Sequence, residues 1–242
     1  MGELVAEIQH LKKSFGSNDV LKDINLKIGK GENLVVLGKS GSGKSVLIRC
    51  LVGLIEPDDG KVVLLGNDIS ALKDSELNLL RKRVGFLFQS AALYDSMTVR
   101  ENLEFPLRDT RKISKAEMEL LVMEALKNVG LEDAIDKMPS ELSGGMRKRV
   151  GLARTLILKP ELILYDEPTT GLDPITSKEI SKLILDVQKK YDATSIIITH
   201  DVDCARITAN SIVIIKDGAS VAEGTFKELS VSNDEWVRSF FE

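Results

Sequence analysis

The chain has 242 residues, of which 43% are hydrophobic and 29% charged, and its formal net charge is −4 at pH 7. At about 150 residues per domain, this length indicates one large domain or two small ones. The 18 Gly and 6 Pro are too few for a fibrous or largely disordered protein. The acidic balance argues against nucleic-acid binding by bulk charge, so no nucleic-acid partner is expected.

The two cysteines, Cys50 and Cys204, form no disulfide framework and no paired metal motif, and their apolar neighbours predict burial. Residues 1–5 lack the basic and apolar regions of a secretory signal. No segment approaches the roughly 18 uninterrupted apolar residues of a membrane-spanning helix. We expect a cytoplasmic chain that reaches a membrane only through a partner.

The first elements read as strands. Residues 24–28 alternate apolar and polar side chains, which predicts a half-buried strand. Residues 33–37 form a short apolar run that predicts a fully buried strand. A helix is predicted over 44–54, ended by the Pro/Gly turn signal at 56–60, and residues 62–65 predict another strand.

The middle of the chain is helical in character. Ser114 and Glu117 have capping-box spacing and open a helix with apolar residues at helical period, for which Gly130 is the stop. A second helix is predicted from about 145 to 158.

Strands return at 162–165, 195–199 and 211–215, with a helix at 181–190. Strands that alternate with helices predict an α/β fold with a mainly parallel sheet and helices on its faces. The helical block near 95–158 is predicted to be an insertion into that sheet.

A glycine-rich loop carries the strongest functional signal. Residues 38–45 match the pattern G-x-x-x-x-G-K-S/T in full, between a predicted strand and a predicted helix. Such a loop aims backbone N–H groups at phosphates and adds the positive end of the helix. Lys44 is expected to reach the β- and γ-phosphates, and the Ser45 hydroxyl to bind Mg²⁺. The candidate phosphate-binding residues are Gly38, Ser40, Gly41, Ser42, Gly43, Lys44 and Ser45.

Two acidic residues follow the apolar run at 162–165, at the strand end where open α/β sheets bind ligands. Asp166 fits a second Mg²⁺ anchor that acts through water, and Glu167 a carboxylate that orients or deprotonates an attacking water. The alternative for such a pair is a solvated turn, which the buried strand and the glycine-rich loop disfavour.

Two further polar residues end apolar runs. His200 follows the run at 195–199 and is interpreted as a γ-phosphate sensor, against the alternative of a hydrogen-bonded surface or core residue. Gln89 follows Phe86–Phe88, and its amide could contact the metal or the water.

A second anion-binding device precedes a basic helix. Ser143, Gly144 and Gly145 stand where a helix starts, and their backbone N–H groups predict another anion nest. The chain thus has two phosphate-binding devices but one complete cradle.

Together these motifs resemble the nucleotide-binding subunits of ABC transporters over almost the whole chain. The resemblance implies ATP hydrolysis with Mg²⁺ on an ABC ATPase fold: a P-loop NTPase core, an N-terminal antiparallel β part and an inserted α-helical subdomain. The core would span about 1–90 and 159–242, and the helical subdomain about 91–158.

The resemblance also implies partners and residue roles. Two copies would pair head to tail, so that Ser143 and Gly145 of one cap the ATP of the other. Asp173 would lie in the loop that crosses between the two ATP sites, and Gln89 in the link to membrane permease subunits. Phe15 would stack on adenine, against the alternative of core packing.

Three positions depart from the usual family pattern. Met146 replaces a glutamine whose amide could contact the ribose. Val46 replaces a hydroxyl residue, which leaves any α-phosphate contact to the backbone N–H. Phe15 replaces the commoner tyrosine and keeps the stacking face.

Within the family, residues 43–46, 88–94 and 142–146 are most similar to Mla-type phospholipid transport ATPases. These work with a multispanning permease and an MCE-type lipid-binding protein, which would place the chain on the inner face of the cell membrane. The alternatives are ATPases of lipoprotein release or cell division, a soluble iron–sulfur assembly ATPase, and a P-loop small-molecule kinase.

The tail carries a short apolar stripe made of Trp236, Val237, Phe240 and Phe241. We expect it to pack on its own domain; the alternative is contact with a second copy or a regulator.

Overall fold

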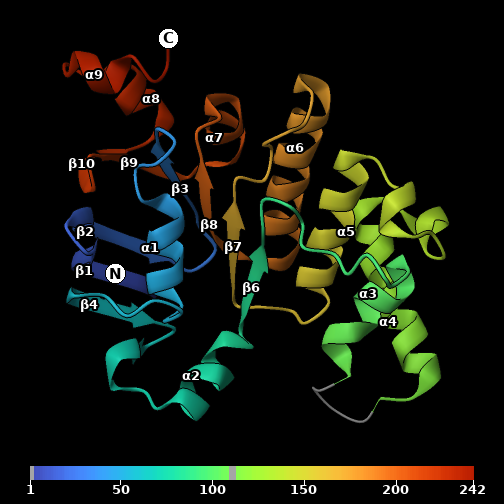
Figure 1. Ribbon diagram of the computed structural model, residues 1–242. Helices are drawn as coiled ribbons and strands as arrows, with labels where there is room; N and C mark the ends of the chain where they lie inside the picture. Colours follow the sequence, from blue (N-terminus) through green and yellow to red (C-terminus); the bar gives the residue numbers. More distant parts are fainter. Residues whose placement is uncertain (1–2, 109–112) are drawn as a thin grey trace.

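The computed structural model describes residues 3–108 and 113–242. Its strands form one sheet in the order β5-β4-β1-β2-β10-β9-β3-β8-β7-β6 (Figure 1). The strands are β1 (Leu4–Phe15), β2 (Asn18–Gly29), β3 (Asn33–Gly38), β4 (Asp59–Leu64), β5 (Asn67–Asp68), β6 (Val84–Leu87), β7 (Leu162–Asp166), β8 (Thr194–Thr199), β9 (Ser211–Lys216) and β10 (Ala219–Gly224).

Helices cover the sheet and fill the segment between β6 and β7. The α-helices are α1 (Lys44–Leu51), α2 (Asp74–Arg81), α3 (Val99–Glu104), α4 (Lys115–Val129), α5 (Gly144–Leu156), α6 (Pro174–Tyr191), α7 (Val202–Thr208), α8 (Phe226–Ser230) and α9 (Glu235–Arg238). Short 3-10 helices span Ile69–Ala71, Phe105–Leu107, Glu132–Ala134 and Pro139–Glu141. None of the helices in the described ranges is long and apolar enough to span a membrane.

The centre of the sheet is parallel. β3 pairs with β8 and β9, and β7 pairs with β8 and β6, all in parallel. Both β3 and β8 are buried along their whole length, as continuous apolar runs require in a sheet covered on both faces. The predicted α/β class is confirmed, and the carboxyl ends of these strands meet at one edge.

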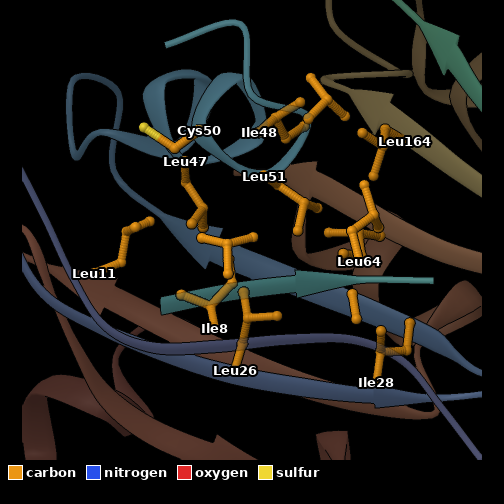
Figure 2. Close-up of a cluster of buried hydrophobic side chains, with 14 of the residues drawn as sticks. Ile8, Leu11, Leu26, Ile28, Leu47, Ile48, Cys50, Leu51, Leu64 and Leu164 are labelled. Atoms are coloured by element: carbon orange, nitrogen blue, oxygen red, sulfur yellow. The ribbon is translucent and has the colours of Figure 1, made fainter. Parts of the chain in front are cut away.

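The N-terminal part of the sheet is antiparallel, as expected: β1 pairs with β2 and β4, and β4 with β5. Its inner face packs under α1, and Figure 2 shows Ile8 and Leu26 of the strands facing Leu47 and Leu51 of the helix. Full burial of each such side chain contributes about 1.5–3 kcal/mol. This cluster fixes α1, and with it the glycine-rich loop, against the sheet.

Helix α1 ends at Leu51, earlier than the predicted residue 54. Gly53 adopts a φ of +65°, outside the helical region. The Arg81 guanidinium donates to the carbonyl oxygens of Val52 and Gly53 at 2.9 and 2.6 Å. The last carbonyls of α1 itself accept backbone N–H groups of this turn: Gly53 donates to Cys50 at 3.0 Å and Leu54 to Arg49 at 2.8 Å. Gly53 therefore ends the helix, and Arg81 holds the turn that follows.

Between β6 and β7, α3, α4 and α5 pack together around a hydrophobic cluster of their own, beside the edge of the sheet (Figure 1). The Ser114 hydroxyl accepts a hydrogen bond from the N–H of Glu117 at 3.2 Å, and Gly130 ends α4 with a φ of 66°. Both predicted boundaries of this helix are confirmed. Part of the predicted helical block, 109–112, lies outside the described residues.

The opposite face of the sheet is covered by α6, α7 and the C-terminal helices. Helix α6 begins at Pro174 rather than at residue 181, because Asp173 caps it and proline suits the first helical position. Val237 is buried in this second cluster, and Trp236, Phe240 and Phe241 pack against it. The tail therefore packs on its own chain, as expected.

Candidate active site

The glycine-rich loop joins β3 to α1. Gly43 is the N-cap of α1 with a φ of 94° and makes no side-chain capping bond, so the first-turn N–H groups stay open toward the loop. A Cβ at Gly43 would lie 2.7 Å from Leu21 Cδ2 and 2.9 Å from the Val20 carbonyl oxygen. Only glycine fits both the torsion and the space, and the loop forms a cradle for phosphate oxygens.

Lys44 is 6% exposed at the centre of this loop. Its Nζ donates to the carbonyl oxygens of Gly38 at 2.7 Å and Lys39 at 3.1 Å, and lies 3.6 Å from Glu167 Oε1. Burial lowers the pKa of the Lys44 ammonium, and the Glu167 carboxylate opposes that shift. A bound triphosphate would add negative charge here and favour the charged form.

A cavity of about 380 Å³ opens over the loop. It gathers residues from five separate segments at the carboxyl edge of the sheet. From the loop and α1 it is lined by Ser40, Gly41, Gly43, Lys44, Ser45 and Val46. From elsewhere it is lined by Val20, Gln89, Glu167, Thr170 and His200; of these, Val20 and Thr170 were not predicted from the sequence.

Ser45 and Asp166 offer neighbouring oxygen atoms to a cation. The Ser45 hydroxyl donates to Asp166 Oδ1 at 3.4 Å, from the first turn of α1 to the end of β7. Burial, followed by the nearby Glu167 charge, raises the pKa of Asp166. Mg²⁺ binds through one or two carboxylates together with substrate phosphates and water, and this pair beside the phosphate cradle fits that pattern.

The Glu167 carboxylate is held by two neighbours. Its Oε2 accepts a hydrogen bond from the Thr170 hydroxyl at 3.1 Å and lies 2.8 Å from Nδ1 of His200. Its side chain is only 13% exposed. The Glu167 N–H donates to the Ile198 carbonyl oxygen at 2.9 Å, which ties the residue to β8. The carboxylate is thus fixed toward the phosphate cradle.

Lys148 approaches the same residue from α5. The side chain is 5% exposed, and its Nζ donates to the Glu167 carbonyl oxygen at 3.1 Å. Burial lowers the pKa of Lys148 to about 8, against the attraction of Asp166 and Glu167. This contact could not be predicted from the sequence, because Lys148 and Glu167 are 19 residues apart and meet only through the packing of α5.

The second predicted anion-binding segment, Ser143 to Gly145, lies outside this cavity. Ser143 caps α5 by accepting the N–H of Met146 at 3.2 Å, and Asp173 caps α6 by accepting two N–H groups at 3.0 Å. A Cβ on Gly145 would lie 2.5 Å from Thr176 Cγ2. The starts of α5 and α6 therefore pack against each other, and Ser143, Gly144, Gly145 and Asp173 are absent from the lining of the cavity.

The remaining predicted residues flank the loop. Gly38 ends β3 and is buried, and the Ser42 hydroxyl oxygen is buried without a hydrogen-bond partner in the part of the chain that the structure describes. Phe15 ends β1 and is 49% exposed, with Lys13 Nζ 5.5 Å from its ring centroid. The alternative interpretation, that Phe15 packs in the core, is therefore wrong. Gln89 is exposed and follows β6.

Comparisons with known proteins identify the family of this chain. The family model described as "ABC transporter" matches residues 21–170. A Mycobacterium leprae protein with the name "Probable ribonucleotide transport ATP-binding protein mkl" is 43% identical to this chain over 97% of the chain. The chain spans 67% of that protein and 65% of the Mycobacterium bovis relative of the same name.

Two further proteins match over more of their own length. The intermembrane phospholipid transport ATP-binding protein MlaF of Haemophilus influenzae is 38% identical, over 99% of this chain and 91% of its own. A dimeric post-hydrolysis structure of the ATP-binding cassette MJ0796, bound to ADP and Pi, covers 92% of this chain and 99% of its own at 32% identity, with a TM-score of 0.83. The chain therefore belongs to the ABC transporter family, as an ATP-binding domain that binds ATP with Mg²⁺ and hydrolyses the nucleotide.

Proposed function

We propose that Glu167 is the base of the hydrolysis reaction. Its carboxylate, held by His200 and Thr170 and facing the phosphate cradle, takes a proton from the water that attacks the γ-phosphate. Lys44 neutralises charge on the phosphates, Ser45 and Asp166 hold Mg²⁺, and Gln89 contacts the metal or the water. Two observations support the proposal. One cavity is lined by Lys44, Ser45, Gln89, Glu167, Thr170 and His200. Asp166 lies next to it, where its Oδ1 accepts the Ser45 hydroxyl at 3.4 Å.

A Glu167→Gln variant tests this assignment. We expect it to bind MgATP with parental affinity and to lose turnover by about 100- to 10,000-fold, because an amide cannot accept the proton. Phosphate release measures turnover, and calorimetry measures nucleotide affinity. Parental turnover in this variant would reject Glu167 as the base.

We further propose that two copies close head to tail around two ATP molecules. Ser143, Gly144 and Gly145 open the N-terminus of α5 but do not line the cavity of their own chain, so their open N–H groups suit the γ-phosphate bound by a second copy. Asp173 lies beside them at the start of α6, and Phe15 flanks the loop as the adenine platform. The dimeric state of MJ0796 supports this arrangement.

We propose that the segment after β6, around residues 89–97, transmits the movement of dimer closure to a permease. Tyr94 and Phe105 are 43% and 38% exposed, with ring centroids 4.7 Å apart. Asn102 fixes the segment by accepting the Tyr94 N–H at 2.8 Å and donating to the Met97 carbonyl at 3.0 Å, while Arg154 of α5 donates to the Ala91 carbonyl at 3.1 Å. An exposed aromatic surface tied to α5 suits a protein partner.

We propose a phospholipid as the transported substrate, with an MCE-type protein beside the permease and the chain peripheral on the inner face of the cell membrane. The similarity to MlaF, 38% identical over 99% of this chain, supports that choice.

The division into a core at about 1–90 and 159–242 and a helical subdomain at about 91–158 is part of the proposal. The separate hydrophobic cluster of α3, α4 and α5 supports it.

The closest competing substrate is a ribonucleotide, which the name of mkl suggests. To separate the two, the chain is purified with its membrane partners and reconstituted in vesicles that contain phospholipid alone or ribonucleotides as well. Lipid transport predicts ATP-dependent movement of labelled phospholipid that Glu167→Gln abolishes. Movement of labelled ribonucleotide without lipid movement would favour the competitor, and recovery of the chain without any membrane partner would favour a non-transport ATPase.

A further inference from the structure

The backbone of Glu167 is held in an unusual conformation. Its φ of 50° lies in the left-handed region, which is uncommon and strained for a residue with a side chain. Such a conformation persists only where neighbouring groups over-determine it. The Glu167 N–H is tied to the Ile198 carbonyl at 2.9 Å, and the Glu167 carbonyl accepts the Thr170 N–H at 3.3 Å.

Lys148 provides a further hold on the Glu167 backbone, from a different part of the fold. Its ammonium donates to the same Glu167 carbonyl at 3.1 Å, across 19 residues of sequence. It is also a cation buried to 5% exposure, and it stands on the helix that Ser143 caps. A buried cation costs free energy unless it is hydrogen-bonded, and the Glu167 carbonyl oxygen is an acceptor for this ammonium.

We propose that Lys148 is a positioning residue for ATP hydrolysis, which aims the Glu167 carboxylate by holding its backbone from α5. This inference rests on the proposed role of Glu167. Because α5 also carries the Ser143–Gly145 segment at its start, the same bond links the helix that contacts the partner's ATP to the base of the chain's own site. A shift of α5 would then reposition Glu167.

The test is a Lys148→Met variant, which keeps a long side chain but cannot donate. We expect its kcat to fall on the order of 10- to 100-fold, as small misplacement of a reacting group does. The KM for MgATP should stay unchanged, because Lys148 is absent from the lining of the nucleotide cavity. The unfolding temperature should not fall, because burial of the charge is removed and the Thr170 N–H still bonds the Glu167 carbonyl.

The matched control is Arg149→Met, on the same helix. Arg149 also donates to a backbone carbonyl, that of Val129 at 3.1 Å, and pairs with Glu179 at 2.8 Å, away from the active site. We expect parental kcat from this variant. If Arg149→Met loses as much turnover as Lys148→Met, the effect belongs to the packing of α5 and the inference is overturned.

A double-mutant cycle separates positioning from any other role. Lys148 acts through Glu167 only if Lys148→Met leaves the residual single-turnover rate of Glu167→Gln unchanged. An equal loss in both backgrounds would overturn the inference. Parental activity in Lys148→Met, beside an inactive Glu167→Gln, would overturn the role of Lys148 alone, whereas parental activity in Glu167→Gln would overturn the proposed function itself.

Discussion

Nδ1 of His200 lies 2.8 Å from Oε2 of Glu167, across the gap between the ends of β8 and β7. Glu167 is nearly buried while His200 keeps 56% of its side chain exposed, so the imidazole contacts the carboxylate through Nδ1 and also lines the cavity. The histidine therefore both orients the carboxylate and can contact a phosphate bound beside it.

A His200→Ala variant should lose this orientation. We expect kcat to fall by about 100-fold or more, with a smaller change in nucleotide affinity, since the phosphate cradle is intact. The control is His10→Ala, because His10 is the other histidine of the chain and makes a similar pair, 3.0 Å from Asp23, on the exposed surface. Equal activity of the two variants would reject a role for His200.

Lys44→Ala should remove the central cation of the loop. A charged hydrogen bond contributes about 1.5–3 kcal/mol, so MgATP affinity should fall roughly 10- to 100-fold. Calorimetry measures the loss, and far-UV circular dichroism checks that α1 is intact. Unchanged affinity would show that the loop does not bind the nucleotide phosphates.

Phe15 offers a test of the adenine platform that leaves the fold alone, because its ring is 49% exposed. Phe15→Leu should weaken ATP binding by about 1–3 kcal/mol, the usual contribution of one base stacked on an aromatic ring. Phe15→Tyr should keep parental affinity. Binding of inorganic tripolyphosphate should be the same in all three proteins, and a matching loss for tripolyphosphate would place the effect on the loop rather than on the base.

The sequence was sufficient for features that local chemistry determines. The loop 38–45 could be placed because glycine torsions and the following helix are encoded in adjacent residues, and the strand ends at Asp166 and His200 because apolar runs stop there. Lys148 and Thr170 could not be found. Their partner is Glu167, and the first contact depends on how α5 packs against the turn after β7.

The displaced helix boundaries have local and distant causes. Gly53, with a φ of +65°, ends α1 early. The turn after it is held by the Arg81 side chain of α2, nearly 30 residues later in the chain. The early start of α6, by contrast, was encoded locally in Asp173 and Pro174, a cap followed by proline that the periodicity of 181–190 did not include.

The head-to-tail arrangement predicts that Ser143 affects association rather than nucleotide binding. In a Glu167→Gln background, MgATP should drive the protein from monomer to dimer in analytical ultracentrifugation. Adding Ser143→Arg should keep the chain monomeric while its ATP affinity as a monomer stays parental, since Ser143 is not among the residues that line its own cavity. A dimer that survives this bulky substitution would remove Ser143 from the interface.

The buried ammonium of Lys148 predicts a measurable dependence of stability on pH. Its pKa is lowered from 10.5 to about 8 in the folded chain, so between these values the unfolded chain binds more protons than the folded chain. The free energy of unfolding contributed by this group therefore rises as pH increases through that window.

The Lys148→Met variant lacks this pH-dependent contribution. Its advantage in unfolding temperature over the parent should therefore be largest near pH 7 and shrink toward pH 10. The difference between Arg149→Met and the parent should stay constant over the same range. A constant difference for Lys148→Met as well would mean that Lys148 is not a charged group held in a buried site.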